Sequence, residues 1–183
     1  MPHFYAGADA ATHATRFYRW LAASVVVIAA LQFFDSHTKT DVTPDGVISF
    51  MFLNRTPEGA AAALRAWTAA QKQWAAFALG FDYLFMPCYS CMIAGACIWA
   101  AEIGRFLPTL GTVLAWAMIP AALFDAAENY GLFMLLTGSE HVTWGAPTFF
   151  CTIAKFSLLA AGSVYVAAAA VATRCCASRR KSD

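Results

Sequence analysis

The sequence predicts an all-α integral membrane protein, a four-helix bundle whose long first loop contains an interfacial helix. Hydrophobic residues make up 60% and charged residues 13% of the 183 positions, and the mean hydropathy is +0.56. A soluble globular domain carries about 25% charged residues. A hydrocarbon core about 30 Å thick takes about 20 apolar residues as a helix, so long apolar runs in this chain are expected to span a bilayer. We expect a single membrane domain over residues 1–183.

Four apolar runs have, or nearly have, the length of a span. They are residues 17–34, 74–101, 108–137 and 147–173. The first run follows Arg16 and lacks a small-residue cleavage site before its polar exit, so we expect a retained span rather than a signal peptide.

The distribution of basic residues predicts the orientation. With four spans, both termini and the turn at Arg105 share one side of the membrane, which then carries seven Lys and Arg residues. The opposite side carries four, all of them in the long first loop. Positively charged residues accumulate on the cytoplasmic side. Both termini are therefore expected in the cytoplasm, or on the equivalent inner side.

The first loop, residues 35–73, is expected to contain one helix. Thr56, Pro57 and Glu58 are typical of a helix start, as an N-cap, a proline at the first helical position and an acid in the first turn. This helix is expected over about residues 57–72, on the outer membrane surface or continuing into the second span. The preceding stretch "GVISFMFLN" is apolar without helical length, and is expected to dip into the interface or to cover the bundle.

Ionisable residues lie inside three of the four spans at similar depths. With a rise of about 1.5 Å per residue, Asp82 lies about 12 Å below the start of the second span, and Lys155 about 12 Å below the start of the fourth. In the third span, Glu128 and Asp125 lie about 14 and 18 Å from its end. A charge at such a depth costs a few kcal/mol unless it pairs or lines a wet cavity. One shared polar site in the outer half of the membrane is therefore expected.

Neighbouring residues extend this site. Asn129 shares a helix face with Asp125 and Glu128 because the three are spaced i, i+3 and i+4. Tyr89 belongs to a similar stripe with Asp82 on the second span.

Three acids against one lysine leave an excess of two negative charges if all ionise. This excess suits a divalent cation held by oxygen ligands, an amine-bearing headgroup, or carboxyl groups that stay partly protonated and relay protons. The alternative is structural: Lys155 pairs with one acid, the other acids are protonated and hydrogen-bonded, and the group only fixes helix register. A lysine at this depth can also extend toward the outer interface.

The cysteines and histidines indicate no further site. Cys88 and Cys91 have redox-motif spacing, but membrane oxidoreductases of this size need a second pair on the outer side, and the long loop has no cysteine. We expect both to be packing residues. Cys175 and Cys176, after the last span, would be candidates for palmitoylation in a eukaryote. No catalytic nucleophile, metal-ligand set, phosphate loop or nucleic-acid-binding surface is recognisable, so no enzymatic activity is predicted.

Three stretches carry a family resemblance: "TPDGVISFMFLNRTPEGAAAALRAW", "ALGFDYLFMPCYS" and "LFDAAENYGLFML". They resemble a group of poorly characterised four-span bacterial membrane proteins, similar in having Asp-Tyr/Phe-Leu-Phe in the second span and Asp-x-x-Glu-Asn in the third. The likeness covers most of residues 40–137. It implies the four-span fold and the polar positions Asp82, Asp125, Glu128 and Asn129. It implies no activity, and Lys155 and the cysteines lie outside the pattern.

Two functions fit these observations. The first is a small transporter or binding protein with an outer-facing carboxylate pocket that takes a cation, a proton or an amphipathic small molecule. The second is an accessory subunit of a larger membrane complex, in which the buried acids serve helix packing. The expected partners are the lipid bilayer, other membrane subunits or a second copy of the chain, and a divalent cation is the one cofactor considered. The expected site residues are Asp82, Asp125, Glu128 and Asn129, with Tyr89 and Lys155 as partners.

Overall fold

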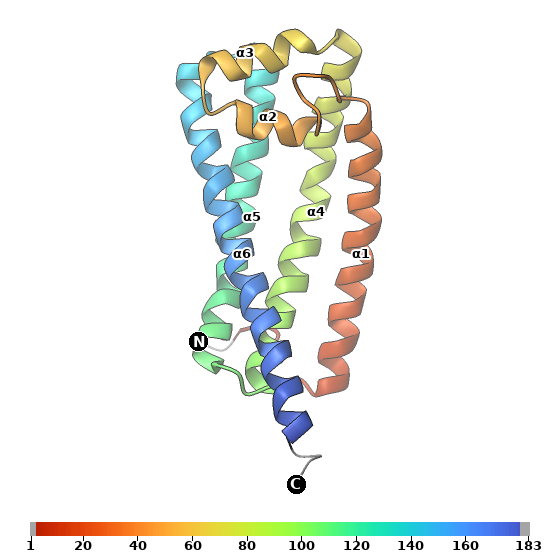
Figure 1. Ribbon diagram of the computed structural model, residues 1–183, viewed down its shortest axis with the longest axis vertical. Coiled ribbons are helices and arrows are strands. Elements are labelled where there is room, and N and C mark those ends of the chain that lie inside the picture. Colours follow the sequence, from red (N-terminus) through yellow and green to blue (C-terminus); the bar gives the residue numbers. More distant parts are fainter. Residues whose placement is uncertain (1–2, 180–183) are drawn as a thin grey trace. The chain divides into compact units, whose positions relative to one another are not determined.

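The computed structural model describes residues 3–179, with side chains as far as residue 174. The side chains of Cys175 and Cys176 therefore lie outside the described part. Six helices form in the order shown in Figure 1: α1 (Ala10–Ser36), α2 (Val47–Leu53), α3 (Pro57–Ala66), α4 (Ala69–Glu102), α5 (Pro108–Leu136) and α6 (His141–Arg179).

Four of these helices are long and apolar enough to cross a membrane: α1, α4, α5, and α6 as far as Arg174. Their most apolar windows have mean hydropathies of 1.6 to 1.8, which indicates an integral membrane protein. The helix α1 begins well before the apolar run because Asp9 caps it, with Oδ1 accepting from the Thr12 backbone N–H at 2.7 Å. Hydrogen bonds from the Thr12 hydroxyl and from its backbone N–H hold the pKa of Asp9 below its ordinary value.

The chain folds into two compact units. The first unit takes in residues 3–23, 88–121 and 156–179, and the second takes in residues 24–87 and 122–155. Each long helix contributes one segment to each unit.

In the second unit, a buried polar network ties the first loop to the end of α1. Asp35 Oδ1 accepts from the Thr38 hydroxyl at 2.9 Å and from the Val47 backbone N–H at 2.6 Å. Trp67 Nε1 donates to the Thr38 carbonyl oxygen at 2.6 Å. Gly46 has a positive φ of 60°, and a Cβ at this position would overlap the Asp35 carboxylate. The network therefore joins the loop to the start of α2 and to the end of α3.

The short helices α2 and α3 lie across the ends of the second unit's α4 and α5 segments (Figure 1). The stretch expected to lack helical length is in fact the seven-residue helix α2. It is held there by burial, because Phe50 is fully buried in one apolar cluster with Ala63 of α3, Leu79 of α4 and Leu132 of α5. This cluster covers the helix ends, one of the two arrangements expected for the stretch.

The helix α3 begins as expected but ends earlier. The Thr56 hydroxyl accepts from the Gly59 backbone N–H at 3.1 Å, but the helix stops at Ala66 rather than at residue 72. Trp67 adopts an extended conformation that lets its indole reach Thr38. Thr68 and Gln71 then form a reciprocal capping box that starts α4.

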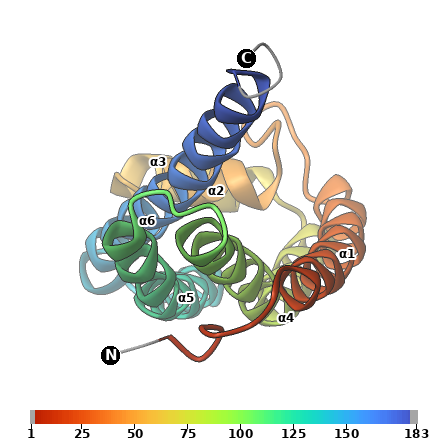
Figure 2. The ribbon, with the colours of Figure 1, turned by 90° about the horizontal axis from the view of Figure 1, so that it is seen from below.

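In the first unit, the N-terminal segment of residues 3–9 runs alongside α4 and α5 before α1 begins (Figure 2). The Gly7 backbone N–H lies 3.0 Å from both carboxylate oxygens of Glu102, and His13 Nε2 lies 3.3 Å from Glu102 Oε2. The buried His3 ring packs edge-on against Trp116, with 4.7 Å between ring centroids. Burial of Tyr5 raises its pKa to about 12. The segment is therefore part of the folded unit.

The core of the first unit is built from small residues and a buried tyrosine. Ala94 and Cys97 of α4 pack with Ala115 and Met118 of α5 and with Tyr165 of α6. The Tyr165 hydroxyl donates to the Phe106 carbonyl oxygen, in the turn between α4 and α5. Gly111 lies so close to Tyr165 that a Cβ at this position would overlap the hydroxyl.

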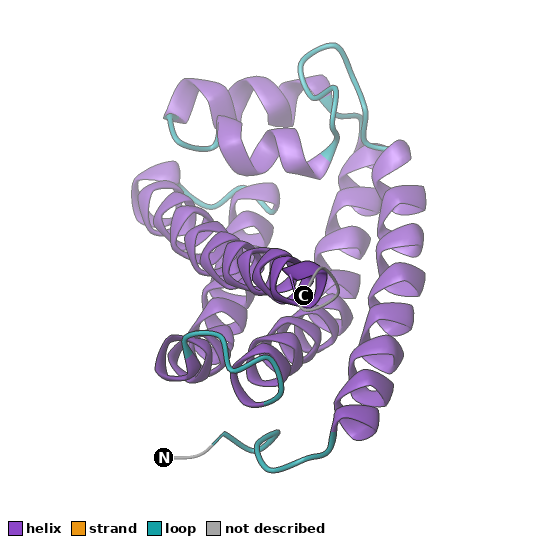
Figure 3. Ribbon diagram, turned by 60° about the horizontal axis from the view of Figure 1, so that its bottom comes forward, coloured by secondary structure: helices purple, strands orange, loops and turns teal. Residues whose placement is uncertain are grey.

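The all-α prediction holds over the described residues, in which Figure 3 shows helices and connecting loops without a strand. The four long helices are consistent with the expected membrane bundle.

Candidate functional site

A cluster of ionisable side chains is buried in the second unit, and α5 supplies most of it. Asp125, Glu128 and Asn129 are spaced i, i+3 and i+4 and therefore share one helix face. They are 2%, 0% and 2% exposed. The apolar residues of α5 flank this face, so the helix presents its polar stripe to the inside of the unit.

Lys155 of α6 lies between two of these acids. Its Nζ is 2.8 Å from Asp125 Oδ1 and 2.6 Å from Glu128 Oε2. The lysine is only 4% exposed, so it does not extend toward the interface. Two carboxylates on α5 thus share one ammonium group on α6.

Asp82 of α4 joins the cluster through Asn129. The Asn129 side-chain amide donates to Asp82 Oδ2 at 2.7 Å and to the Leu79 carbonyl oxygen at 3.4 Å. Tyr83, the next residue of α4, also reaches α5, because its hydroxyl donates to the Ala126 carbonyl oxygen at 3.0 Å. Asp82 is partly exposed, whereas the α5 residues are not. Asp82 is therefore the residue through which the cluster contacts the surroundings of the unit.

Close packing of α5 against α6 sets the position of the lysine. A Cβ at Gly131 would overlap the Thr148 hydroxyl, so only glycine permits this approach, one turn from Glu128. Thr148 and Thr152 are buried beside it, and the Thr152 hydroxyl donates to the Thr148 carbonyl oxygen at 3.1 Å. The small and polar residues of this contact allow α6 to bring Lys155 within reach of both acids.

One carboxylate oxygen in the cluster is left over. Glu128 Oε2 faces Lys155, whereas Glu128 Oε1 makes no hydrogen bond of normal geometry with a described residue, and the Thr152 hydroxyl lies beside this carboxyl group. A buried polar oxygen without a partner is costly at membrane depth. Glu128 can therefore take a proton or contact a bound ligand at Oε1 without giving up its contact with Lys155.

The formal charge of the cluster is −2 if its three acids and its lysine all ionise. Among the described residues, no group of three His, Cys, Asp or Glu side chains is placed to hold a metal ion. Lys155 occupies the position between Asp125 and Glu128 that an added cation would otherwise take.

Tyr89, the remaining expected residue, is buried and belongs to the first unit. Cys88 and Cys91 belong to the same unit. Outside the cluster, His141 Nε2 contacts the Asn54 carbonyl oxygen at 2.6 Å, and His37 stacks on Trp74.

Sequence reasoning missed the groups that complete the site. The Leu79 carbonyl and Thr148 carry no signal of their own, because a backbone oxygen and a threonine in an apolar span are common. Gly131 is the one available sign, since it lies three residues after Glu128 and permits a close helix approach.

No protein-family model, curated protein or solved structure matches the chain.

Proposed function

We propose that the protein is a small membrane transporter that binds a proton, or a small cation in its place, at the carboxylate cluster of the second unit. The observation that carries this proposal is Glu128, which is fully buried, faces Lys155 through Oε2 and makes no hydrogen bond of normal geometry at Oε1 with a described residue. A carboxyl group in this position exchanges one proton without breaking any contact that the described residues make to Oε1.

The charge of the cluster supports proton binding. Lys155 balances one of the two acids it contacts, and the amide of Asn129 offers Asp82 a hydrogen bond but no charge. Ionisable residues at membrane depth are functional by default because keeping them there is costly. One proton would bring the formal charge of the cluster from −2 to −1 and a second would neutralise it, so the cluster can cycle between charge states.

Access to the cluster supports exchange rather than a closed structural pair. Asp82 is partly exposed and reaches Asn129, which neighbours Glu128 along the chain. We propose that protons enter at Asp82 and are stored at Glu128, with Lys155 holding Asp125 and Glu128 in place. The amphipathic-ligand alternative has less support, because Lys155 already fills the place of an amine headgroup.

The decisive variant is Glu128→Gln. If Glu128 is protonated in the folded protein, glutamine replaces a neutral group of nearly the same shape, so the variant should fold and keep its thermal stability. It should also lose the infrared carbonyl band of a protonated carboxylic acid. In proteoliposomes with an internal pH-sensitive dye, a membrane potential should drive protons inward through the wild-type protein, and Glu128→Gln should reduce this flux to that of protein-free vesicles.

Glu58→Gln is the matched control, because it makes the same chemical change at an exposed position of α3. It should keep both the carbonyl band and the proton flux. A stable Glu128→Gln variant with wild-type flux would contradict the proposal, as would a wild-type protein whose flux equals that of empty vesicles.

The structural-subunit alternative is favoured by one specific feature. The same contacts link three helices, since Asn129 joins α5 to α4 and Lys155 joins α6 to α5. Under this alternative Glu128 is the ionised partner of Lys155, so Glu128→Gln should lower stability or prevent assembly. Native mass spectrometry of the gently solubilised protein separates the two functions, because a subunit should retain partner chains and a transporter should appear as one kind of chain.

We also propose that both termini lie in the cytoplasm, which would place the cluster in the outer half of the membrane. The excess of seven basic residues over four supports this orientation. A fluorescent protein fused after residue 183 should be active in cells, whereas a secreted phosphatase fused at the same place should not. The reverse pattern would overturn the orientation.

A further inference from the structure

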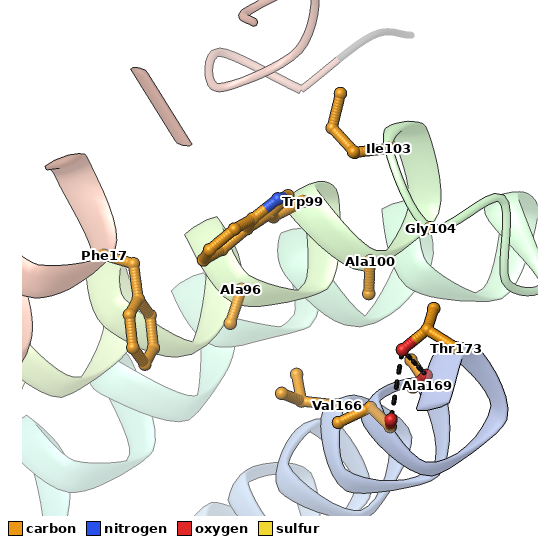
Figure 4. A pocket seen from close by; sticks show the side chains of 10 residues that line it. Phe17, Ala96, Trp99, Ala100, Ile103, Gly104, Val166, Ala169 and Thr173 are labelled. Carbon is orange, nitrogen blue, oxygen red and sulfur yellow. Dashed lines mark hydrogen bonds between the residues drawn. The ribbon is translucent and has the colours of Figure 1, made fainter. Parts of the chain in front are cut away.

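A largely apolar hollow of about 390 Å³ lies in the first unit, bordered by α1, α4 and α6 (Figure 4). It belongs to a different unit from the carboxylate cluster. Its volume falls in the range of small-molecule pockets, about 300–1,000 Å³.

Small residues create this hollow. Ala96 and Ala100 of α4 face Ala169 of α6, and Ala170 also lines the space. Their methyl groups do not fill the gap that larger side chains would close. Phe17 of α1 and Trp99 of α4 form an aromatic wall, with 6.2 Å between their ring centroids.

Two arginines directly follow residues that line the hollow. Arg105 follows Gly104 in the sequence, and Arg174 follows Thr173. Gly104 and Thr173 both line the hollow. Both arginines are exposed, and neither forms an ion pair with another described residue. Arginine side chains are long enough to bring their charged heads to the rim while their stems lie on apolar surface.

The nearest acid does not compensate these charges. Glu102 accepts from the Gly7 backbone N–H and lies 3.3 Å from His13 Nε2, so its carboxylate is engaged on the N-terminal segment. Arg16 is likewise engaged, with its guanidinium 5.5 Å above the Tyr5 ring. Arg105 and Arg174 are therefore two exposed cations that a negatively charged ligand can use.

We infer that this hollow binds an anionic phospholipid. One acyl chain lies between the alanine surfaces of α4 and α6, against Phe17 and Trp99. The phosphate lies at the helix ends, where Arg105 and Arg174 meet the headgroup. The apolar slot matches the acyl chain of such a lipid, and the exposed arginines near its end match the phosphate.

The test is native mass spectrometry of the full-length protein in a neutral detergent, with phosphatidylglycerol and phosphatidylcholine of identical acyl chains. The wild-type protein should retain one phosphatidylglycerol roughly tenfold more tightly than phosphatidylcholine. The double variant Arg105→Gln with Arg174→Gln should bind the two lipids equally. Ala170→Phe should weaken phosphatidylglycerol binding by roughly tenfold or more, because the ring occupies the acyl slot.

Ala167→Phe is the matched control. Ala167 is exposed on the same helix, three residues before Ala170, and does not line the hollow. Its variant should bind phosphatidylglycerol as the wild-type protein does. Equal retention of the two lipids by the wild-type protein would overturn the inference, as would Ala170→Phe binding as tightly as Ala167→Phe.

Discussion

The two units use the same four long helices but fill their interiors differently. The second unit buries Asp125, Glu128 and Lys155 in the middle of helices. The first unit packs alanines, a cysteine and Tyr165 there, and its described acids and arginines lie near helix ends. The second unit therefore depends on charge balance in addition to its apolar cluster, whereas the first depends mainly on shape. A largely apolar chain can thus bury an ionic cluster in one of its two units.

Lys155→Met should show the dependence on charge most strongly. Removing the ammonium group leaves Asp125 and Glu128 facing each other without a cation, which typically costs about 3–5 kcal/mol when a buried pair is broken. Equilibrium unfolding in mixed detergent measures the loss. Adding Asp125→Asn to Lys155→Met should restore part of it, because the acid that loses its cation is then neutral.

Lys39→Met is the control for this comparison, since Lys39 is exposed in the loop of the same unit. Its effect should stay within about 0.5 kcal/mol. If the two lysine variants unfold alike, the second unit does not depend on its buried charges.

Gly46→Ala should have the next largest effect, about 2–3 kcal/mol, because the methyl group combines an unfavourable positive φ with overlap of the Asp35 carboxylate. Gly138→Ala isolates the first of these causes, since Gly138 has a φ of 95° and nothing within 4 Å of its Cβ position. Thermal unfolding should give a lower midpoint temperature for Gly46→Ala than for Gly138→Ala. Equal midpoints would mean that the Asp35 network yields to the added methyl group.

Gly111→Ala tests the dependence of the first unit on shape. The added Cβ would overlap the Tyr165 hydroxyl, which should cost about 1–3 kcal/mol as overpacking. Gly80→Ala is the matched change, in a helix with open space around the Cβ position, and should cost nothing. Hydrogen exchange of residues near Phe106 should rise in Gly111→Ala alone. No difference between the two variants would show that Tyr165 moves aside freely.

His3 should give the smallest effect, a pH dependence of N-terminal docking. Burial lowers the pKa of His3 from its ordinary value of 6.5, so the undocked segment binds a proton more readily than the docked one. Docking is therefore complete above pH 6.5 and weakens as the pH falls below it. Limited proteolysis of the N-terminal segment should accelerate in that range. His3→Phe, which keeps an aromatic ring against Trp116, should remove this part of the pH dependence, and an identical profile for both proteins would contradict the assignment.

The sequence predicts those parts of the structure that depend on composition and local pattern. Four helices follow from long apolar runs, and the start of α3 follows from Thr56, Pro57 and Glu58. The early end of α3 was predictable in part, because Thr68 and Gln71 form a capping box. Nothing local, however, indicates that the Trp67 indole binds the carbonyl of Thr38, 29 residues earlier.

The candidate site divides in the same way. Helical spacing places Asp125, Glu128 and Asn129 on one face, and depth brings Asp82 and Lys155 to a similar level. The ion pairs cannot be predicted from spacing and depth, because they depend on how closely the helices approach. The contact of Lys155 with two acids follows from the Gly131 and Thr148 approach.

The pairing of Lys155 with α5 bears on how the protein is made. The helix α5 leaves the ribosome first, with Asp125 and Glu128 in its apolar stretch, and the lysine follows on α6. Until α6 arrives, the two acids have no cation, and an acid at a span's centre counts against insertion. We expect α5 and α6 to enter the bilayer together as a hairpin. A nascent chain halted before residue 155 should therefore remain in contact with the insertion machinery longer than a chain that includes it.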